Sequence, residues 1–123
     1  MQNKNPTERA IELHNLIEDD RKRRNTTTAV GNTNSTLTII GTNDEYMRLE
    51  IKKALLDHEI VAKSTPGKHA EENIIAEATS KDLKILEIGA SRPICLDCEE
   101  LINELGLETT TGFSGKKSKN RRL

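Results

Sequence analysis

The apolar residues near the start of the chain recur at helical spacing. Asn5-Pro6-Thr7-Glu8 is typical of a helix start, with Asn as the cap and Glu at the third helical position. The basic run 21–24 is typical of a helix end, because cations stabilise the last turn. We therefore expect one helix from about residue 6 to residue 24. Its inward stripe consists of Ala10, Leu13, Leu16 and Ile17.

β-Branched residues dominate the next part of the chain, where the apolar period changes. Residues 26–30 and 36–41 flank the turn-forming stretch 31–35, and this arrangement predicts a β-hairpin. Asn43 is then a candidate cap for a second helix. The buried side of that helix would consist of Met47, Ile51, Ala54 and Leu55.

The second half of the chain predicts two further helices separated by a strand. Ile74, Ile75 and Ala78 share the inward face of the first, and Gly106 ends the second. The expected segments are an extended stretch at 60–62, a loop at 65–68 followed by a helix, a strand at 83–88, a turn at 89–93, a helix at about 95–105 and a strand at 107–111. This order, α-β-β-α-α-β-α-β, indicates an α/β fold with helices packed on a sheet.

The composition limits the size of the core. The chain has 123 residues, of which 33% are hydrophobic and 2% aromatic, so we expect one domain with a small aliphatic core. We assign residues 5–113 to the folded core and residues 114–123 to a flexible basic tail. So small a core would gain stability from a bound metal ion.

The net charge of −1 favours no particular partner, but the basic residues are clustered in 21–24 and 116–122. The tail is equally consistent with a solvated end and with contacts to phosphate. The chain has no run of 18 apolar residues, and its first residues lack the apolar segment of an export signal. We therefore expect no transmembrane segment, no signal peptide and no membrane partner.

The candidate chemistry lies in His69-Ala70-Glu71 and in Pro93-Ile94-Cys95-Leu96-Asp97-Cys98. One His and two Cys make a three-ligand zinc site, which leaves a fourth position for water. Glu71 is not needed as a ligand and is free to move protons. His-x-Glu with a later Pro-Cys-x-x-Cys is the signature of zinc nucleobase deaminases. The simpler alternative is a surface His, a solvated Glu and two buried thiols.

The expected helix starts explain how these ligands would converge. Cys95 and Cys98 lie on one side of a helix start, where the helix dipole favours thiolates. His69 follows a Pro-Gly loop at another helix start, and it must lie at the mouth of that helix for Glu71 to reach the same site. A purely structural zinc would need a fourth ligand, for which His14 and His58 are the spare candidates.

Five residues are candidate substrate contacts. Thr27 and Asn32 lie where the first strand leads toward the expected pocket, although a plain hairpin role explains them as well. Ser91 and Arg92 would contact phosphate or base, or else serve only in a turn. Ala70 lies between the candidate ligand and the candidate acid-base residue.

The set Pro66-Gly67-Lys68-His69-Ala70-Glu71 with Ser91-Arg92-Pro93-Ile94-Cys95-x-x-Cys98 resembles the deaminase toxin domains of bacterial polymorphic toxin systems, within the cytidine deaminase-like superfamily. The similarity extends from about residue 13 to residue 113 and includes the opening helix and first strand. The chain differs from the usual motif in having Ile94 between the Pro and the first Cys.

This resemblance implies a three-layer α/β/α fold with a sheet of about four to five strands and helices on both faces. It also implies bound Zn²⁺ at His69, Cys95 and Cys98, with Glu71 as the catalytic residue. The substrate would be cytosine in DNA, converted to uracil, and the partner a cognate immunity protein. We expect a monomer that is the C-terminal toxin domain of a longer protein and acts in the target-cell cytoplasm.

Other functions remain open at this stage. A deaminase of free nucleosides or nucleotides, or one that acts on RNA or on adenine, shares the same zinc chemistry. A non-catalytic zinc-stabilised interaction domain is the alternative from another class. The intact Glu71 argues against it, because a structural zinc site has no need of that carboxylate.

Overall fold

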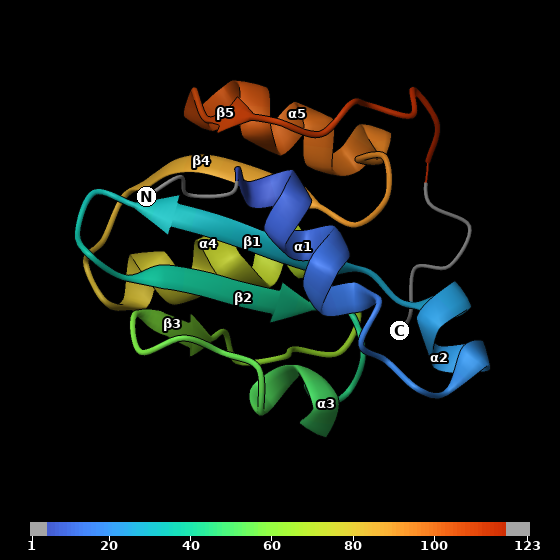
Figure 1. The fold of residues 1–123 in the computed structure, drawn as a ribbon. Helices are drawn as coiled ribbons and strands as arrows, with labels where there is room; N and C mark the ends of the chain where they lie inside the picture. Colours follow the sequence, from blue (N-terminus) through green and yellow to red (C-terminus); the bar gives the residue numbers. More distant parts are fainter. Residues whose placement is uncertain (1–4, 118–123) are drawn as a thin grey trace.

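The computed structural model describes residues 5–117, which form a five-stranded mixed sheet and five helices (Figure 1). The sheet has the order β3-β2-β1-β4-β5, with β1 antiparallel to both of its neighbours. The outer pairs, β2 with β3 and β4 with β5, are parallel. The strands are β1 (Thr28–Thr33), β2 (Thr38–Thr42), β3 (Glu59–Val61), β4 (Ile85–Ala90) and β5 (Glu108–Thr109).

Helices cover both faces of this sheet, as the α/β prediction requires (Figure 1). On one face, α1 and α3 share a core with Val30 and Ile40 of the central strands. On the other face, α4 and α5 pack against Ala29 and Ile39. The helices are α1 (Pro6–His14), α2 (Asp20–Asn25), α3 (Leu49–Lys52), α4 (Ala70–Ser80) and α5 (Leu96–Leu105).

Strand alternation determines which core each residue joins. Ala29 and Val30 are neighbours on β1 yet belong to opposite cores, because successive side chains in a strand point to opposite faces. Gly41 on β2 lies where α4 approaches the sheet most closely, since a Cβ there would be 2.7 Å from the Ala70 carbonyl oxygen. The absence of this side chain allows the first turn of α4 to rest on β2.

The single N-terminal helix that we expected is wrong, because the chain forms two helices there. The Asp19 side chain accepts a hydrogen bond from Lys22 N (3.0 Å) and starts α2 anew. Between the helices, Ile17 N donates to His14 O (3.1 Å) in a tightened turn. Ile17 is buried there, whereas Leu16, which we assigned to the inward stripe, is 39% exposed.

The helix predicted after Asn43 is also wrong in its start and its length. Only the four-residue α3 forms, and its cap position is Arg48. The Asn43 side chain instead accepts a hydrogen bond from Thr27 N (2.8 Å) and so ties the end of β2 to the entry of β1. In the same region, the first hairpin strand is shifted by two to three residues relative to the prediction, which extends β1 through residues 31–33.

The C-terminal part of the described chain remains hydrogen-bonded beyond the boundary that we expected at residue 113. Ser114 N donates to Ile94 O (2.8 Å), and Leu96 N donates to Lys116 O (2.9 Å). This segment therefore lies beside the entry to α5. Residues 118–123 of the predicted basic tail lie outside the described part of the chain. None of the helices within residues 5–117 is both long enough and apolar enough to cross a membrane.

Candidate metal centre

The structure brings His69, Cys95 and Cys98 together, as the spacing predicts. The Nδ1 atom of His69 lies 3.2 Å from the Sγ atom of Cys95 and 3.4 Å from that of Cys98. The three candidate ligand atoms all lie within 4.8 Å of one another. Within residues 5–117, this is the one group of three or more His, Cys, Asp or Glu side chains close enough to hold a metal ion.

Two helix starts supply the ligands. His69 is the N-cap residue of α4, and Cys95 is the N-cap residue of α5, so both precede the first helical turn. Cys98 lies one turn into α5 and is buried. Because backbone N–H groups of a first turn carry partial positive charge, both helix starts favour thiolates at this position.

The donor set fits zinc. Zn–S bonds of about 2.3 Å and Zn–N bonds of about 2.0–2.1 Å, at a tetrahedral angle, place sulfur and nitrogen about 3.6 Å apart. The separations of 3.2 and 3.4 Å are close to this value. Imidazole and thiolate ligands are typical of zinc, whereas Mg²⁺ and Ca²⁺ prefer oxygen ligands.

Glu71 lies in the first turn of α4 and lines the same pocket as His69 and Cys95. Its side chain is almost fully buried, with 4% of the residue exposed. Burial raises the pKa of Glu71; the neighbouring Glu72 adds to the increase, and Arg92 counteracts part of it. The sequence required His69 to lie at the mouth of its helix if Glu71 was to reach the same site. His69 is the N-cap residue of α4, and both side chains line one pocket, so this requirement is met.

The Cys98 thiol shows why a cation suits this position. Burial raises the pKa of Cys98, and the negative charge of Glu71 raises it further. A bound divalent cation has the opposite effect, since it stabilises the thiolate directly. A positive charge between the two helix starts would therefore stabilise both the Cys98 thiolate and the Glu71 carboxylate.

The pocket beside this cluster has a volume of about 160 Å³. Three of the predicted substrate contacts line it, namely Thr27, Ala70 and Arg92. Sequence reasoning missed four further lining residues: Asn43, Ser114, Lys116 and Lys117. The available signal for Asn43 was a polar residue directly after a buried strand, which we interpreted as a helix cap.

Ser91 and Arg92 both make backbone contacts that hold the pocket together. The Ser91 hydroxyl accepts a hydrogen bond from Thr28 N (3.0 Å). The Arg92 guanidinium donates to Arg24 O (2.8 Å) and to Thr26 O (2.6 Å), so it links the end of α2 to the pocket wall. The turn role that we considered for these two residues is therefore present.

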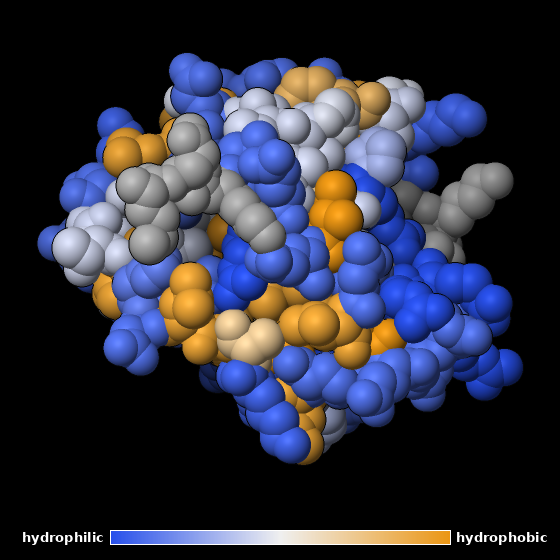
Figure 2. All heavy atoms as spheres, in the orientation of Figure 1, coloured by the Kyte–Doolittle hydropathy of each residue, from blue (hydrophilic) through white to orange (hydrophobic). Residues whose placement is uncertain are grey.

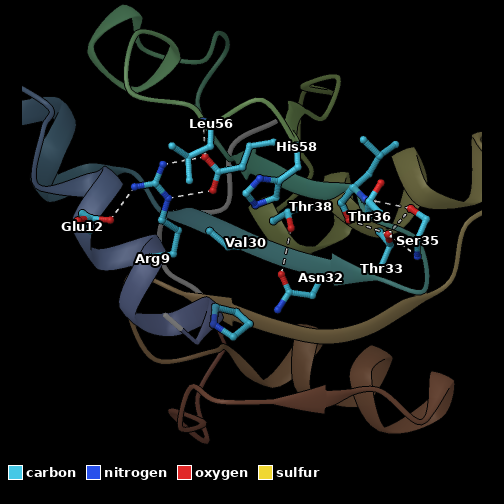
Figure 3. A pocket seen from close by; sticks show the side chains of 13 residues that line it. Arg9, Glu12, Val30, Asn32, Thr33, Ser35, Thr36, Thr38, Leu56 and His58 are labelled. Atoms are coloured by element: carbon cyan, nitrogen blue, oxygen red, sulfur yellow. Dashed lines mark hydrogen bonds and ion pairs between the residues drawn. The ribbon is translucent and has the colours of Figure 1, made fainter. Parts of the chain in front are cut away.

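Asn32 does not lie at the cluster. It is five residues from Thr27 along an extended segment, which corresponds to about 16 Å at 3.3 Å per residue. Its side chain accepts from the Thr38 hydroxyl (3.2 Å) and borders a larger hollow of about 650 Å³ on the α1 side of the sheet (Figure 3). Arg9 in that hollow is already paired with Glu12 and Glu59.

Neither spare histidine supplies a fourth ligand. The His14 ring is buried, with Nε2 donating to Arg23 O (2.6 Å) and Nδ1 accepting from the Thr28 hydroxyl (2.9 Å). His58 is exposed and borders the larger hollow. Within the described residues, the candidate centre therefore has three protein ligands, the number typical of a catalytic zinc.

Comparison with known proteins provides no family assignment. A scan against protein-family models, a search of curated proteins and a search of solved structures each returned no match. The functional interpretation of this chain therefore rests on its α/β fold and on the geometry of the His69, Cys95 and Cys98 cluster beside the buried Glu71.

Proposed function

We propose that this chain is a zinc-dependent deaminase of the cytidine deaminase-like type, acting on cytosine in nucleic acid. The observation that carries the proposal is the buried Glu71 on the pocket that His69 and Cys95 line, next to a three-ligand cluster. His69, Cys95 and Cys98 would hold Zn²⁺. The bound ion would supply Lewis-acid activation of a water molecule.

Glu71 would act as the general base and then as the general acid of the hydrolysis. Its carboxylate takes a proton from the attacking water and gives it to the ring nitrogen, while the water oxygen forms a bond to the carbon bearing the amine. The bond from that carbon to the amine nitrogen then breaks, and Glu71 delivers the second water proton so that ammonia leaves. Water and cytosine are thereby converted to uracil and ammonia without an organic cofactor.

The small pocket favours a polymer over a free nucleotide. Pockets that enclose a whole small molecule typically have volumes of about 300–1,000 Å³, whereas this one has about 160 Å³. A single base would fill it, and the attached sugar and phosphate would then remain outside. Lys116 and Lys117 on its rim suit a phosphate backbone.

A non-catalytic zinc-stabilised domain is the second candidate, and it is less well supported. A structural zinc normally has four protein ligands, while three converge within residues 5–117. A structural site also gives no reason to bury the ionisable Glu71 beside the two thiols, since burying such a group is costly.

The direct test is incubation of the purified chain with defined oligonucleotides, followed by sequencing for C-to-T conversion. Glu71→Gln should lower the rate by at least the 10²–10⁴-fold typical of general acid-base catalysis, while zinc content stays the same. Glu100→Gln, the same chemical change on the exposed side of α5, is the matched control. Equal conversion by the Glu71 variant would contradict the proposed role.

An antibacterial effector role, with DNA as substrate and a cognate immunity protein, is the biological form of this proposal. It rests on the resemblance of the motif alone. Expression of the chain in a bacterium tests it: the intact protein should impair growth and raise C-to-T mutations, and the Glu71 variant should do neither. If the Glu71 variant were still toxic, deamination would not be the cause of the growth defect.

A further inference from the structure

The last described residues run alongside the entry to α5, where the candidate ligand Cys95 lies. Three backbone hydrogen bonds hold them there, from Ile94 N to Gly112 O (2.9 Å), from Ser114 N to Ile94 O (2.8 Å) and from Leu96 N to Lys116 O (2.9 Å). Figure 1 shows the chain after β5 passing the start of α5. Residues 112–117, called the strap from here on, are therefore attached to the chain on both sides of Cys95.

Ile94 anchors the strap, and it is also the residue that sets this chain apart from the usual motif. In that motif a proline lies directly before the first Cys, whereas here Ile94 takes this place and is fully buried. Proline has no backbone N–H, so it could not donate the hydrogen bond that Gly112 O accepts. The departure from the motif therefore supplies the backbone group that fixes the strap beside Cys95.

The strap forms one wall of the pocket of about 160 Å³, to which it contributes Ser114, Lys116 and Lys117. Both lysines are exposed, and none of the ion pairs among residues 5–117 includes either of them. Arg92 adds a third cation, and the buried Glu71 is the one acidic residue among the described residues that line the pocket. Figure 2 shows mostly hydrophilic residues on the side of the molecule where α2 and the start of α5 lie. The charged groups at the rim of the pocket are therefore cations.

We propose that the strap is the wall of the pocket that binds the substrate backbone, with Lys116 and Lys117 contacting the phosphates on one side of the target base. This inference deepens the proposed function and rests on it for the identity of that base. A base that fills the pocket leaves its phosphates outside, where both ammonium groups lie. The two lysines belong to one short segment, so they face the same side of the bound base. They act on binding and not on the chemical step.

The test is a titration of the full 123-residue chain carrying Glu71→Gln with a fluorescein-labelled single-stranded DNA that contains one cytosine. For single strands, each phosphate contact adds about 0.7 to the slope of log K against log salt, so two contacts are worth about 25-fold at about 0.1 M salt relative to 1 M. Lys116→Gln together with Lys117→Gln should therefore raise Kd by about 25-fold at about 0.1 M salt, and the difference should vanish toward 1 M. Arginine at both positions keeps the charges and should restore most of the affinity.

The matched control is Lys52→Gln together with Lys53→Gln. These are also adjacent exposed lysines, but they lie at the end of α3, which packs on the opposite face of the sheet from α4 and α5. The change in net charge is the same, so an effect of net charge alone would appear in both pairs. We expect the control pair to leave Kd unchanged and both pairs to retain their zinc content.

Uncharged methylphosphonate linkages identify the phosphates that the strap contacts. Two of them on one side of the cytosine should weaken binding of the parent chain by about the same factor as the loss of both lysines. The two changes together should then cost no more than either alone, because they remove the same contacts. Neutral linkages on the other side should add their own loss to that of the lysines. In the conversion assay, the chain with native Glu71 and both lysines replaced should show a raised KM with kcat unchanged.

The outcomes separate this inference from the proposed function. Multiplicative losses on both sides of the cytosine, equal Kd values for the two lysine pairs, or a parent chain that does not bind the oligonucleotide would overturn the role of the strap. A non-multiplicative cycle on one side, together with no base conversion by the native chain, supports the strap and overturns the deaminase. Base conversion by a native chain whose Kd does not depend on Lys116 and Lys117 does the reverse.

Discussion

Gly41 lies beneath the first turn of α4, next to the candidate metal site, so a single methyl group there should disturb both the core and the site. It lies on β2 under the first turn of α4, next to Ala70 and Ile74. Ala70 stands between His69, a candidate ligand, and Glu71, the candidate acid-base residue. The Gly41→Ala substitution therefore tests whether the close approach of α4 to the sheet sets the site geometry.

The size of the effect follows from the contacts. A Cβ at position 41 would lie 2.7 Å from the Ala70 carbonyl oxygen, and ordinary contact begins at 3.4 Å, so this carbonyl must move by about 0.7 Å. The contact is to backbone, which cannot rotate away as a side chain can. Overpacking of this kind costs typically about 1–3 kcal/mol. Loss of support around ligands lowers metal affinity by about 10- to 100-fold.

Chemical denaturation with and without chelator measures the stability, and competition with a chromophoric chelator measures zinc affinity. Gly106→Ala is the matched control for destabilisation alone. Its φ of 70° costs a side chain about 1–2 kcal/mol, but a Cβ there would meet no atom within 4 Å, and Gly106 ends α5 far from Cys95. Gly112→Ala, with open space and no positive φ, should change neither quantity.

Zinc binding by Gly41→Ala that is as tight as binding by Gly106→Ala, at the same loss of stability, would contradict this prediction. That result would mean that α4 can shift without carrying His69 away from the two cysteines. A fully stable Gly41→Ala protein would refute the packing argument as well.

Three further predictions concern the ligands and the buried charged groups. Metal analysis should show zinc bound in a one-to-one ratio. In thermal melts, removal of zinc should lower the Tm of the native chain but not that of Cys95→Ser. A Cys95→Ser protein with full metal content would contradict the ligand set. Arg9→Met should destabilise the fold by about 3 kcal/mol in urea denaturation, because it leaves the Glu59 carboxylate, only 3% exposed, without its cation. The double variant with Glu59→Met should recover most of this loss. Equal losses in the single and double variants would contradict this prediction. Burial lowers the pKa of His14 from 6.5, so the folded chain resists protonation of this ring. The free energy of unfolding should therefore be at its full value above about pH 6.5 and fall below that pH by up to about 1.4 kcal/mol per pH unit. His14→Gln should make the free energy of unfolding less dependent on pH in this range.

The sequence by itself determined the chemistry of the centre and the class of the fold. His69, Glu71, Cys95 and Cys98 were identified from residue type and spacing, and the structure brings the three candidate ligands together. Their helix starts were readable because caps and turns are local signals, within a few residues of the positions that they control. The β-branched runs likewise predicted the hairpin, whereas the assignment of its neighbouring residues Ala29 and Val30 to opposite cores came from the structure.

Local signals failed where a distant partner competed for the same group. Asn43 has the chemistry of a helix cap, yet its side chain bonds to Thr27, sixteen residues earlier. The helix expected through residue 24 is interrupted by a tightened turn that ends at the buried Ile17, and the Asp19 side chain then caps a new helix. For Arg92 the sequence left a substrate contact and a turn role open; the structure shows that it donates to two backbone carbonyls of the α2 segment and also lines the pocket.

Only the tertiary structure decided which groups share the pocket. The strand order β3-β2-β1-β4-β5 depends on pairings between segments that are far apart in the chain, and the period of two that identifies a strand says nothing about its neighbour. That order brings the starts of α4 and α5 together, moves Asn32 to the other end of β1, and carries Asn43, Ser114 and Lys116 to the mouth of the site. The burial of Glu71 has the same origin, because a side chain is buried by what packs over it and not by its own sequence.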